Sequence, residues 1–324
     1  MTELKYYQAV QQALAEELAR DPRSLLMGED VGRPGGIFAQ SRGLYNEFGP
    51  NRVIDTPAGE LGFVGAAVGM AMTGLRPIVE ISFADFFATC FDQVVNQAAK
   101  LRFMSGGQAA IPITFTSFGG GGLNAGPQHS STYEAILGGI PGLRVVTAAT
   151  PADAKGLLKT AIREDDPVVV LFHKGLLQER GDVPDGEHLT PIGVAEVCRA
   201  GHDLTIATWA GGRRRSLAAA EQLAADGIEA EVIDLRSIQP LDAATVADSV
   251  RRTRRLLIVQ ETVGFSGIGG ELALQVGELA FDYLDAPIGR LSAPFAPTAF
   301  SPPLEQAYLP APERIVETAR ELLA

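Results

Sequence analysis

The chain has 324 residues, of which 46% are hydrophobic and 20% are charged, and its net charge at pH 7 is −12. This balance is typical of a folded globular protein with enough residues for about two domains, each with a core of its own. The acidic charge argues against non-specific nucleic-acid binding, which needs a basic surface. The two cysteines form no Cys-x-x-Cys motif, so no disulfide framework or zinc site is indicated.

Apolar segments long enough for a membrane are absent from the sequence. None reaches the roughly 18 uninterrupted apolar residues of a membrane span. Residues 1–12 are polar from the second position and lack the apolar core of a signal peptide. We therefore expect a cytoplasmic protein that contacts neither a membrane nor a nucleic acid.

The first half of the chain alternates between short apolar segments and helical ones. In residues 5–20, Val10, Leu14 and Leu18 recur at helical spacing, and the segment ends at Asp21-Pro22, which predicts an amphipathic helix. Segments rich in β-branched residues then alternate with helical ones, which predicts a parallel sheet with helices on both faces. The expected strands are 24–27, 52–55, 76–81, 111–117, 144–150 and 167–173, and the expected helices between them begin at 60, 86 and 151.

The second half restarts the same alternation after an interruption. Residues 174–203 carry Gly, Asp, Pro and His in place of the pattern, so we place an interdomain linker at 181–203. From Leu204 strands and helices alternate again, up to a last helix over 312–323. The sequence therefore predicts an α/β domain over 1–180 and a smaller α/β domain over 204–324.

Glu60 is a single carboxylate in front of an apolar, glycine-rich run, residues 61–73. This composition predicts a helix that is buried nearly all round, with Glu60 at its first position. One interpretation is structural, because a carboxylate there complements the helix dipole and the free N–H groups. The other is functional, because apolar surroundings would favour the protonated carboxyl, which can share a proton with a ligand nitrogen.

Two glycine clusters invite a nucleotide-binding interpretation. Gly119–Gly122 follow a predicted strand, but they form no G-x-G-x-x-G arrangement, and no Walker-type G-K-[ST] occurs in the chain. The second cluster, Gly264–Gly270, is typical of a helix start that lies close to another backbone. Phosphate binding by this chain alone is therefore weakly supported.

Short motifs follow one another in a fixed order along nearly the whole chain. They are Gly28-Glu29-Asp30-Val31, Ser41-Arg42-Gly43-Leu44, Asp55-Thr56-Pro57 with Glu60, Gly74-Leu75-Arg76-Pro77, Phe91-Asp92-Gln93, Met104-Ser105-Gly106-Gly107, Gln128-His129-Ser130, Pro141-Gly142-Leu143, Asp153-Ala154-Lys155-Gly156-Leu157, Asp234-Leu235-Arg236 and Pro240-Leu241-Asp242. In this order they resemble the beta subunit of the thiamine-diphosphate-dependent decarboxylating component of 2-oxo acid dehydrogenase complexes. The resemblance implies a pyrimidine-binding domain followed by a transketolase C-terminal domain.

The resemblance gives Glu60 a chemical role. It implies that the protonated Glu60 carboxyl lies against a ring nitrogen of the cofactor's aminopyrimidine and stabilises the imino tautomer. That tautomer removes the proton from the thiazolium carbon, which then attacks the substrate carbonyl. An aspartate would be one methylene short of the same contact.

The same resemblance assigns further residues to the cofactor. Phe86 matches an aromatic that packs on the aminopyrimidine, although an ordinary core phenylalanine would use the same ring in the same way. Glu29, Ser82 and Thr89 match positions near this ring, and at the last two the contacts are expected from the backbone. His129 matches a histidine of the family's active-site loop that assists substrate handling or acyl transfer, whereas a loop histidine taken alone is more often a surface or capping residue.

A missing motif implies a partner. Enzymes of this kind bind magnesium and the cofactor's diphosphate with a G-D-G motif followed by an Asn, and no G-D-G occurs in this chain. The resemblance therefore implies a separate alpha subunit that supplies this motif, in an α2β2 heterotetramer. In some relatives a potassium ion is bound by backbone carbonyls at positions that match Ile113, Ala161, Glu164 and Asp166.

Departures from the family pattern bear on the substrate. Phe295 stands where many relatives carry Asp, the loop 119–126 is unusually glycine-rich, and residues 175–178 replace an aromatic-containing segment. These departures leave the substrate and the acyl acceptor open. Three functions are considered: oxidative decarboxylation of a 2-oxo acid such as pyruvate or a branched-chain 2-oxo acid, or acetoin cleavage, with acyl transfer to lipoamide; a carboligase or acyl transferase working without a large complex; and a non-catalytic scaffold subunit, against which the presence of Glu60, Phe86 and His129 argues. The arginine runs 213–215 and 251–255 are either solvated faces or a docking surface for an acidic partner such as a lipoyl acyltransferase core.

Overall fold

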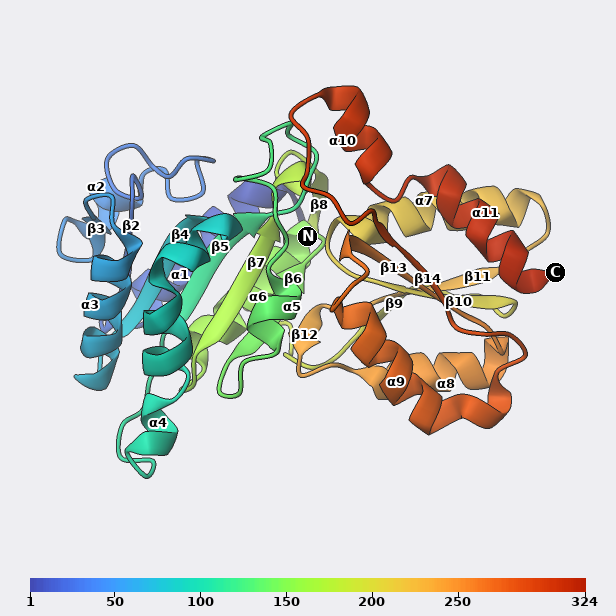
Figure 1. Ribbon diagram of the computed structural model, residues 1–324. Helices are drawn as coiled ribbons and strands as arrows, with labels where there is room; N and C mark the ends of the chain where they lie inside the picture. The colour runs from blue at the N-terminus through green and yellow to red at the C-terminus, as the bar shows by residue number, and fades with distance from the viewer. The chain divides into compact units, whose positions relative to one another are not determined.

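The computed structural model describes all 324 residues (Figure 1). They form two compact units, the first made of Met1–Gly119 and Ile136–Ile192 and the second of Gly120–Ala135 and Gly193–Ala324. The segment expected as a linker, 181–203, contains most of one short strand in the first unit and all of another in the second. The boundaries at 180 and 204 stay a prediction.

A parallel sheet forms the centre of the first unit. Its own strands follow the order β6-β7-β5-β4-β2-β3, and every neighbouring pair is parallel. The alternation in the sequence therefore predicted this α/β architecture correctly. The elements of this unit are β1 (Thr2–Lys5), α1 (Tyr6–Arg20), β2 (Ser24–Gly28), α2 (Leu44–Phe48), β3 (Val53–Asp55), α3 (Glu60–Met72), β4 (Arg76–Phe83), the 3₁₀ helix η1 (Ala84–Cys90), the π-helical segment η2 (Gln93–Ala98), α4 (Leu101–Met104), β5 (Thr114–Gly119), α5 (Glu134–Gly138, which begins in the second unit), β6 (Arg144–Ala148), α6 (Pro151–Arg163), β7 (Val168–His173), the 3₁₀ helix η3 (Lys174–Leu176) and β8 (Arg180–Val183).

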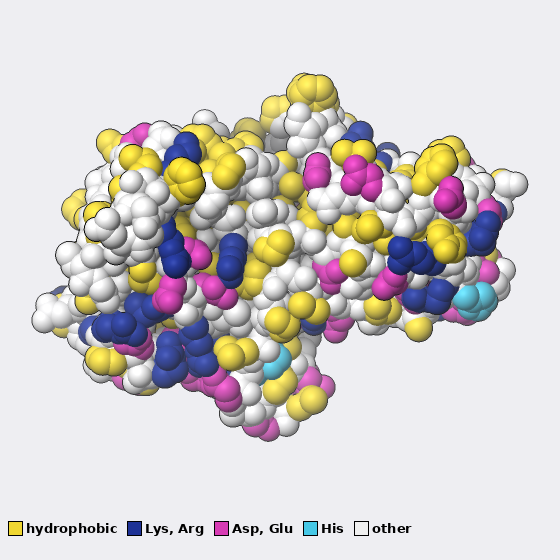
Figure 2. Space-filling view, turned by 90° about the horizontal axis from the view of Figure 1, so that it is seen from below, with side chains coloured by type: hydrophobic (Ala, Val, Ile, Leu, Met, Phe, Trp, Pro, Cys, Tyr) yellow, Lys and Arg dark blue, Asp and Glu magenta, His cyan; other side chains and the backbone are white.

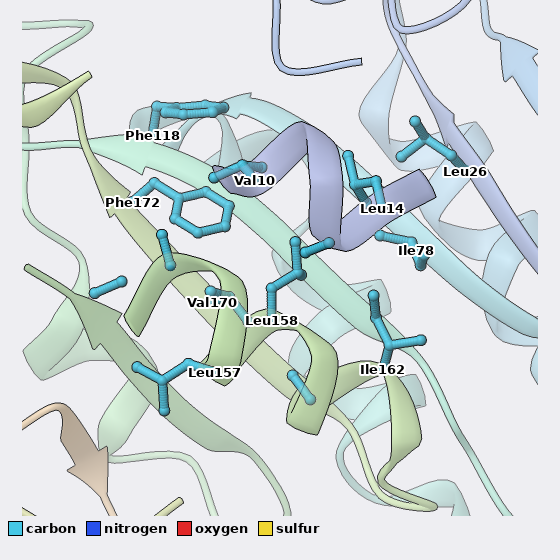
Figure 3. Packing of buried hydrophobic residues seen from close by; sticks show 14 of the residues in the cluster. Val10, Leu14, Leu26, Ile78, Phe118, Leu157, Leu158, Ile162, Val170 and Phe172 are labelled. Atoms are coloured by element: carbon cyan, nitrogen blue, oxygen red, sulfur yellow. The ribbon is translucent and has the colours of Figure 1, made fainter. Parts of the chain in front are cut away.

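Helices α1 and α6 pack against each other and cover one face of this sheet. Their apolar side chains interdigitate with those of the strands, as Val10, Leu158 and Phe172 illustrate (Figure 3). Close packing of this kind is the main stabilising contribution to a domain of this size. It also fixes the strands whose carboxyl ends carry the predicted site.

The other face of the sheet carries α3, which packs against β4, η1 and η2. Here two predictions are wrong. The helix expected to begin at 86 is divided into η1, η2 and α4, because the backbone changes from 3₁₀ to π hydrogen bonding along this segment. Helix α3 is not buried all round, because Leu61 is 57% exposed and Met72 is 51% exposed.

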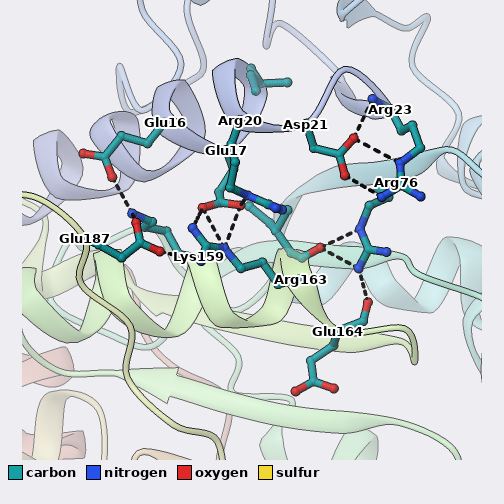
Figure 4. A network of polar contacts seen from close by, with 12 residues as sticks. Glu16, Glu17, Arg20, Asp21, Arg23, Arg76, Lys159, Arg163, Glu164 and Glu187 are labelled. Atoms are coloured by element: carbon teal, nitrogen blue, oxygen red, sulfur yellow. Dashed lines mark hydrogen bonds and ion pairs between the residues drawn. The ribbon is translucent and has the colours of Figure 1, made fainter.

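A network of ion pairs joins α1 to α6 (Figure 4). The side chain of Glu17 is fully buried and accepts hydrogen bonds from Arg20 and Arg163. Lys159, also buried, donates to Glu16 at 2.6 Å and to Glu187 at 2.9 Å. Because every buried charge in this network has an oppositely charged partner, the network joins the two helices without leaving an unpaired charge in the interior.

Replacing Glu17 with Ala is expected to destabilise the first unit by about 3 kcal/mol, because it removes the buried partner of Arg163 and leaves only the exposed Glu187 to pair with that guanidinium. Replacing Glu3 with Ala is the matched control, because Glu3 forms an exposed pair with Arg180 whose contribution should stay below about 1 kcal/mol. Urea denaturation followed by far-ultraviolet circular dichroism measures both. Equal losses of free energy of unfolding in the two variants would contradict the assignment.

The second unit is built around a smaller sheet with the order β14-β13-β10-β11-β9. All pairs are parallel except that between β11 and β9. Helices α7 and α11 pack together on one face, and α8 and α9 on the other. The elements are β9 (Glu196–Arg199), β10 (Leu204–Thr208), α7 (Gly211–Ala225), β11 (Ala230–Asp234), β12 (Ser237–Gln239), α8 (Ala243–Thr253), β13 (Leu256–Val263), α9 (Ile268–Ala280), the 3₁₀ helix η4 (Phe281–Tyr283), β14 (Gly289–Ala293), α10 (Pro302–Tyr308) and α11 (Pro312–Leu323).

None of the helices combines the length and the apolar character that crossing a bilayer requires.

Candidate functional site

Glu60 lies at the first position of α3, close to the carboxyl ends of β2 and β3. Glu29, which directly follows β2, accepts a hydrogen bond of 3.1 Å from the backbone N–H of Gly59. Asp55, the last residue of β3, accepts hydrogen bonds from the N–H groups of Gly32 and Arg33. The start of α3 is therefore held by one carboxylate, and the loop beside it by another. Glu60 itself is half-buried.

Phe86 lies in η1, which packs against α3. Its ring is partly exposed and meets the ring of Phe83 edge to face, with the centroids 5.4 Å apart. Burial raises the pKa of the Cys90 thiol to about 12, and the negative charge of Glu60 adds to this shift. Because α3 packs against η1, the acid at the start of α3 and the aromatic segment adjoin at one edge of the sheet.

The other residues that the sequence assigns to the cofactor lie around the same edge. Ser82 is buried near the carboxyl end of β4, and Thr89 is exposed at the end of η1. The Thr89 hydroxyl donates to the carbonyl of Phe86 at 2.8 Å. The Thr89 side chain therefore stabilises the backbone that carries the Phe86 ring. The roles of these residues in cofactor binding stay predictions.

His129 belongs to the second unit, in a loop that the C-terminal segment holds. The N–H of Asn124 donates to Glu305 in α10 at 3.0 Å. Gly126, with φ +75°, lies so close to the ring of Phe300 that an added Cβ would come within 2.2 Å of it. The sequence marked the neighbouring Phe295 as a departure from the family pattern, but no signal in it indicated that Phe300 and Glu305 support the loop of His129.

One buried carboxyl near the predicted site was missed. Glu80 lies in β4 with 2% of its surface exposed and accepts a hydrogen bond of 2.6 Å from the side-chain amide of Gln40. Burial raises the pKa of Glu80 to about 7, although the hydrogen bond from Gln40 lowers it. The signal in the sequence was a single carboxylate inside an otherwise apolar strand, RPIVEISF.

Three of the four carbonyls proposed for potassium, those of Ile113, Ala161 and Glu164, already accept hydrogen bonds. Val168 N–H donates to the carbonyl of Ile113, and Glu164 N–H donates to that of Ala161. The guanidinium of Arg76 donates to the carbonyl of Glu164 (Figure 4). A cation bound here would meet the positive charge of Arg76, so the residues do not by themselves form a good cation site, and the potassium ion stays a prediction.

A cluster of Glu196, Cys198 and Asp234 in the second unit has the spacing of metal ligands. The Arg213 guanidinium already occupies it, because its Nε lies 3.2 Å from the Cys198 sulfur and 3.6 Å from the Asp234 carboxylate. Arg236 pairs with Glu196 at 2.9 Å. The negative charge of the cluster is thus neutralised by arginine, and it forms an internal ion-pair network.

The arginine runs are bound to the chain's own acceptors. Where basic side chains gather on the face in Figure 2, acidic side chains lie beside them. Pairing of this kind favours the solvated interpretation over a docking surface with free charge. The partners are Glu261 for Arg215, Asp248 and the Leu279 carbonyl for Arg251, Glu231 for Arg252, Asp285 for Arg254, and the Leu322 carbonyl for Arg255.

Family models match both halves of the chain. The transketolase pyrimidine-binding domain matches residues 2–180, and the transketolase C-terminal domain matches residues 193–315. The beta subunit of the Bacillus subtilis acetoin:2,6-dichlorophenolindophenol oxidoreductase is 43% identical over 97% of this chain and 96% of its own length. The chain belongs to the transketolase-type beta-subunit family. The predicted resemblance is therefore confirmed.

Other members of this beta-subunit family are similar over the full length. The pyruvate dehydrogenase E1 component subunit beta of Gracilaria tenuistipitata is 41% identical over 100% of both chains. The 2-oxoisovalerate dehydrogenase subunit beta of Bacillus subtilis is 40% identical over 99% of both. A solved structure named as a split-gene transketolase, an inactive beta4 tetramer, superposes with a TM-score of 0.79 at 21% identity and covers 98% of this chain and 97% of its own, which supports the fold alone.

Proposed function

We propose that this beta-family chain is the catalytic beta subunit of a thiamine-diphosphate-dependent 2-oxo acid or acetoin dehydrogenase. The observation that carries the proposal is Glu60 at the start of α3, a helix that packs against η1, which bears the partly exposed ring of Phe86. The similar proteins are named after acetoin, pyruvate and 2-oxoisovalerate, and these names support oxidation of a 2-oxo acid or of acetoin as the reaction class. When bound, thiamine diphosphate supplies a nucleophilic carbon that this chain's side chains lack.

The residues of this chain bind and orient the pyrimidine half of the cofactor. The Glu60 carboxyl shares a proton with a ring nitrogen of the bound cofactor through a hydrogen bond and so holds a proton there during turnover. Phe86 offers an aromatic face to the ring. Glu29 fixes the backbone N–H of Gly59 and so sets where the Glu60 side chain begins. The half-buried position of Glu60 fits an acid that must meet a ligand from outside the chain.

The diphosphate and magnesium are assigned to an alpha subunit, in an α2β2 enzyme. Among all residues of this structure, the only cluster with metal-ligand spacing is the arginine-bound one in the second unit, and no G-D-G motif is present. The open face of α3, formed by Leu61, Gly62, Ala66, Gly69 and Met72, is apolar and begins at Glu60. An apolar face beside an incomplete site fits coverage by the subunit that completes it.

The acceptor of the acyl group decides between the two enzymatic hypotheses. A dehydrogenase that works with an acyltransferase should transfer the acyl group to lipoamide, whereas a carboligase should transfer it to an aldehyde. We expect acyl-lipoamide when the alpha and beta subunits are incubated with pyruvate, 2-oxoisovalerate or acetoin and free lipoamide. Mass spectrometry of the products tests this, and a carboligation product formed equally well with and without lipoamide would contradict it. Activity that depends on the cofactor would also exclude a scaffold subunit.

A further inference from the structure

A hydrogen-bonded chain of side chains begins at Glu80 and leads toward the predicted cofactor site. The buried carboxyl of Glu80 is bound by a neutral amide, the Nε2 of Gln40, rather than by a cation. Gln40 is itself 1% exposed, so the Glu80 carboxyl and the Gln40 amide are both shielded from solvent. A buried polar pair of this kind is stable only while its hydrogen bond is intact.

The oxygen of the Gln40 amide holds the backbone of the loop 29–43, which connects β2 to α2. This Oε1 accepts a hydrogen bond of 2.9 Å from the N–H of Phe38. Gly36, with φ +81°, lies directly against the amide, and an added Cβ would come within 2.4 Å of Nε2. The loop is therefore shaped around the Gln40 amide, which fixes the position of Phe38 relative to β4.

Phe38 passes this constraint to the aromatic residues of the site. Its ring meets that of Phe83 edge to face at 5.9 Å, and it also packs on Phe118 at 4.8 Å. Phe83 in turn meets Phe86 at 5.4 Å. The path from Glu80 thus ends at the ring that is proposed to pack on the aminopyrimidine.

Glu80 also adjoins the strand that supports Glu60. It lies opposite Gly28 in the parallel pairing of β4 with β2. An added Cβ on Gly28 would come within 2.6 Å of the Glu80 carbonyl, so the two strands approach closely at this point. The next residue, Glu29, holds Gly59 at the start of α3. Contacts therefore lead from Glu80 to both parts of the predicted site, to Glu60 through β2 and to Phe86 through Phe38.

We propose that Glu80 is a positioning residue for the cofactor site, acting through Gln40 and Phe38 on the ring pair Phe83 and Phe86. Its effect on cofactor affinity rests on the function proposed above, whereas its effect on the loop does not. The contacts of Gln40 with Glu80 and Phe38 lie within the chain and do not involve the cofactor. Their effect on the loop should therefore be measurable in the chain alone.

Titration of Glu80 makes this anchoring dependent on pH. Because burial raises the pKa of Glu80 to about 7, the carboxyl ionises inside the folded loop only as the pH rises through that value. In an opened loop, where water reaches Glu80, the carboxyl would ionise near the ordinary pKa of a glutamate. Opening of the loop therefore becomes easier as the pH rises from that pKa to about 7, and it changes little above pH 7. The other ionisable side chains on the surrounding elements include Glu29 at the end of β2, Asp30, Arg33 and Arg42 in the loop, Glu60 at the start of α3, Asp85 and Cys90 in η1, and Lys174, whose ammonium lies 5.6 Å from the Phe83 ring centroid.

Hydrogen–deuterium exchange of the chain alone tests the anchoring. After correction for the intrinsic exchange rate, peptides covering 28–43 should open roughly tenfold more at pH 8 than at pH 6. Glu80→Gln keeps the acceptor for Gln40 but cannot ionise, so its response to pH should be lost. Gln40→Ala should increase exchange in 28–43 and in 83–90 at both pH values.

Gln260→Ala is the matched control. Gln260 is a buried glutamine of the second unit whose side chain accepts from the Gly269 N–H at 2.9 Å. Its loss should increase exchange around 260–270 and leave 28–43 unchanged. A wild-type pH response in Glu80→Gln, or unchanged exchange at 83–90 in Gln40→Ala, would overturn the proposal.

The assembled alpha–beta enzyme supplies the functional measurement. The KM for thiamine diphosphate should rise from pH 6 to pH 8 in the wild type more than in Glu80→Gln. Identical pH profiles of KM would overturn a role for Glu80 at the cofactor site even if the loop responds. A wild-type pair without any thiamine-diphosphate-dependent activity would instead reject the proposed function, and exchange at 28–43 and 83–90 would still decide the anchoring.

Discussion

Replacing Glu60 with Gln is expected to lower the turnover of the assembled alpha–beta enzyme by about 10²- to 10⁴-fold. The amide has nearly the same shape as the carboxyl and can still form a hydrogen bond to a ring nitrogen. It cannot hold a transferable proton there, so the acid–base contribution is lost while the site keeps its form. Steady-state kinetics with saturating thiamine diphosphate measure the change in kcat.

Two further variants make this result specific. Glu60→Asp keeps the acid but is one methylene shorter, so it should lose activity through misplacement. Glu47→Gln removes an exposed glutamate in the first turn of α2 and should leave kcat unchanged. All variants should keep the wild-type melting temperature to within about 2 °C, because a half-exposed glutamate contributes little to stability. A Glu60→Gln enzyme with more than about half the wild-type kcat would contradict the role.

The isolated chain is expected to bind thiamine diphosphate and magnesium poorly and to show no turnover. Addition of the alpha subunit is expected to give both tight cofactor binding and turnover. The physical reason is that the chain offers an acid and a ring for the pyrimidine but no motif for the diphosphate. Isothermal titration calorimetry with and without the alpha subunit measures the binding, and analytical ultracentrifugation measures the assembly.

A charge on the open face of α3 should prevent this assembly. Leu61→Glu would place a carboxylate in an apolar interface, where an unpaired charge is costly. Leu189→Glu is the matched control, because Leu189 is also an exposed leucine, 43% against 57%, but lies far from α3 in the sequence. We expect Leu61→Glu to remain folded and unassembled. A beta chain that forms a homo-oligomer and binds the complete cofactor with magnesium would contradict the assignment.

The sequence predicted most of what depends on local pattern. The alternation of strands and helices, and the helix that begins at Glu60, could be predicted because each rests on the period of apolar residues along one segment. The division of the helix after Phe86 could not be predicted in this way. It depends on which backbone carbonyl each N–H reaches in η1 and η2, and the spacing of apolar residues does not encode that choice.

Contacts between distant segments explain the other differences. Glu80 is bound by Gln40, forty positions away, and the loop of His129 is held by Glu305 and Phe300. No periodicity in the sequence encodes such pairs. The composition of α3 predicted burial on all sides, but composition does not distinguish a surface covered within the chain from one covered by a partner.

The most direct test of the account follows the proton on the thiazolium carbon of bound thiamine diphosphate. In the wild-type alpha–beta enzyme this proton should exchange with solvent deuterium fast enough to support turnover, as measured by quenched-flow and proton nuclear magnetic resonance. In Glu60→Gln the exchange should slow by about 10²-fold or more, because the acid that assists its removal is gone. Exchange at the wild-type rate in that variant would contradict the claim that Glu60 activates the cofactor.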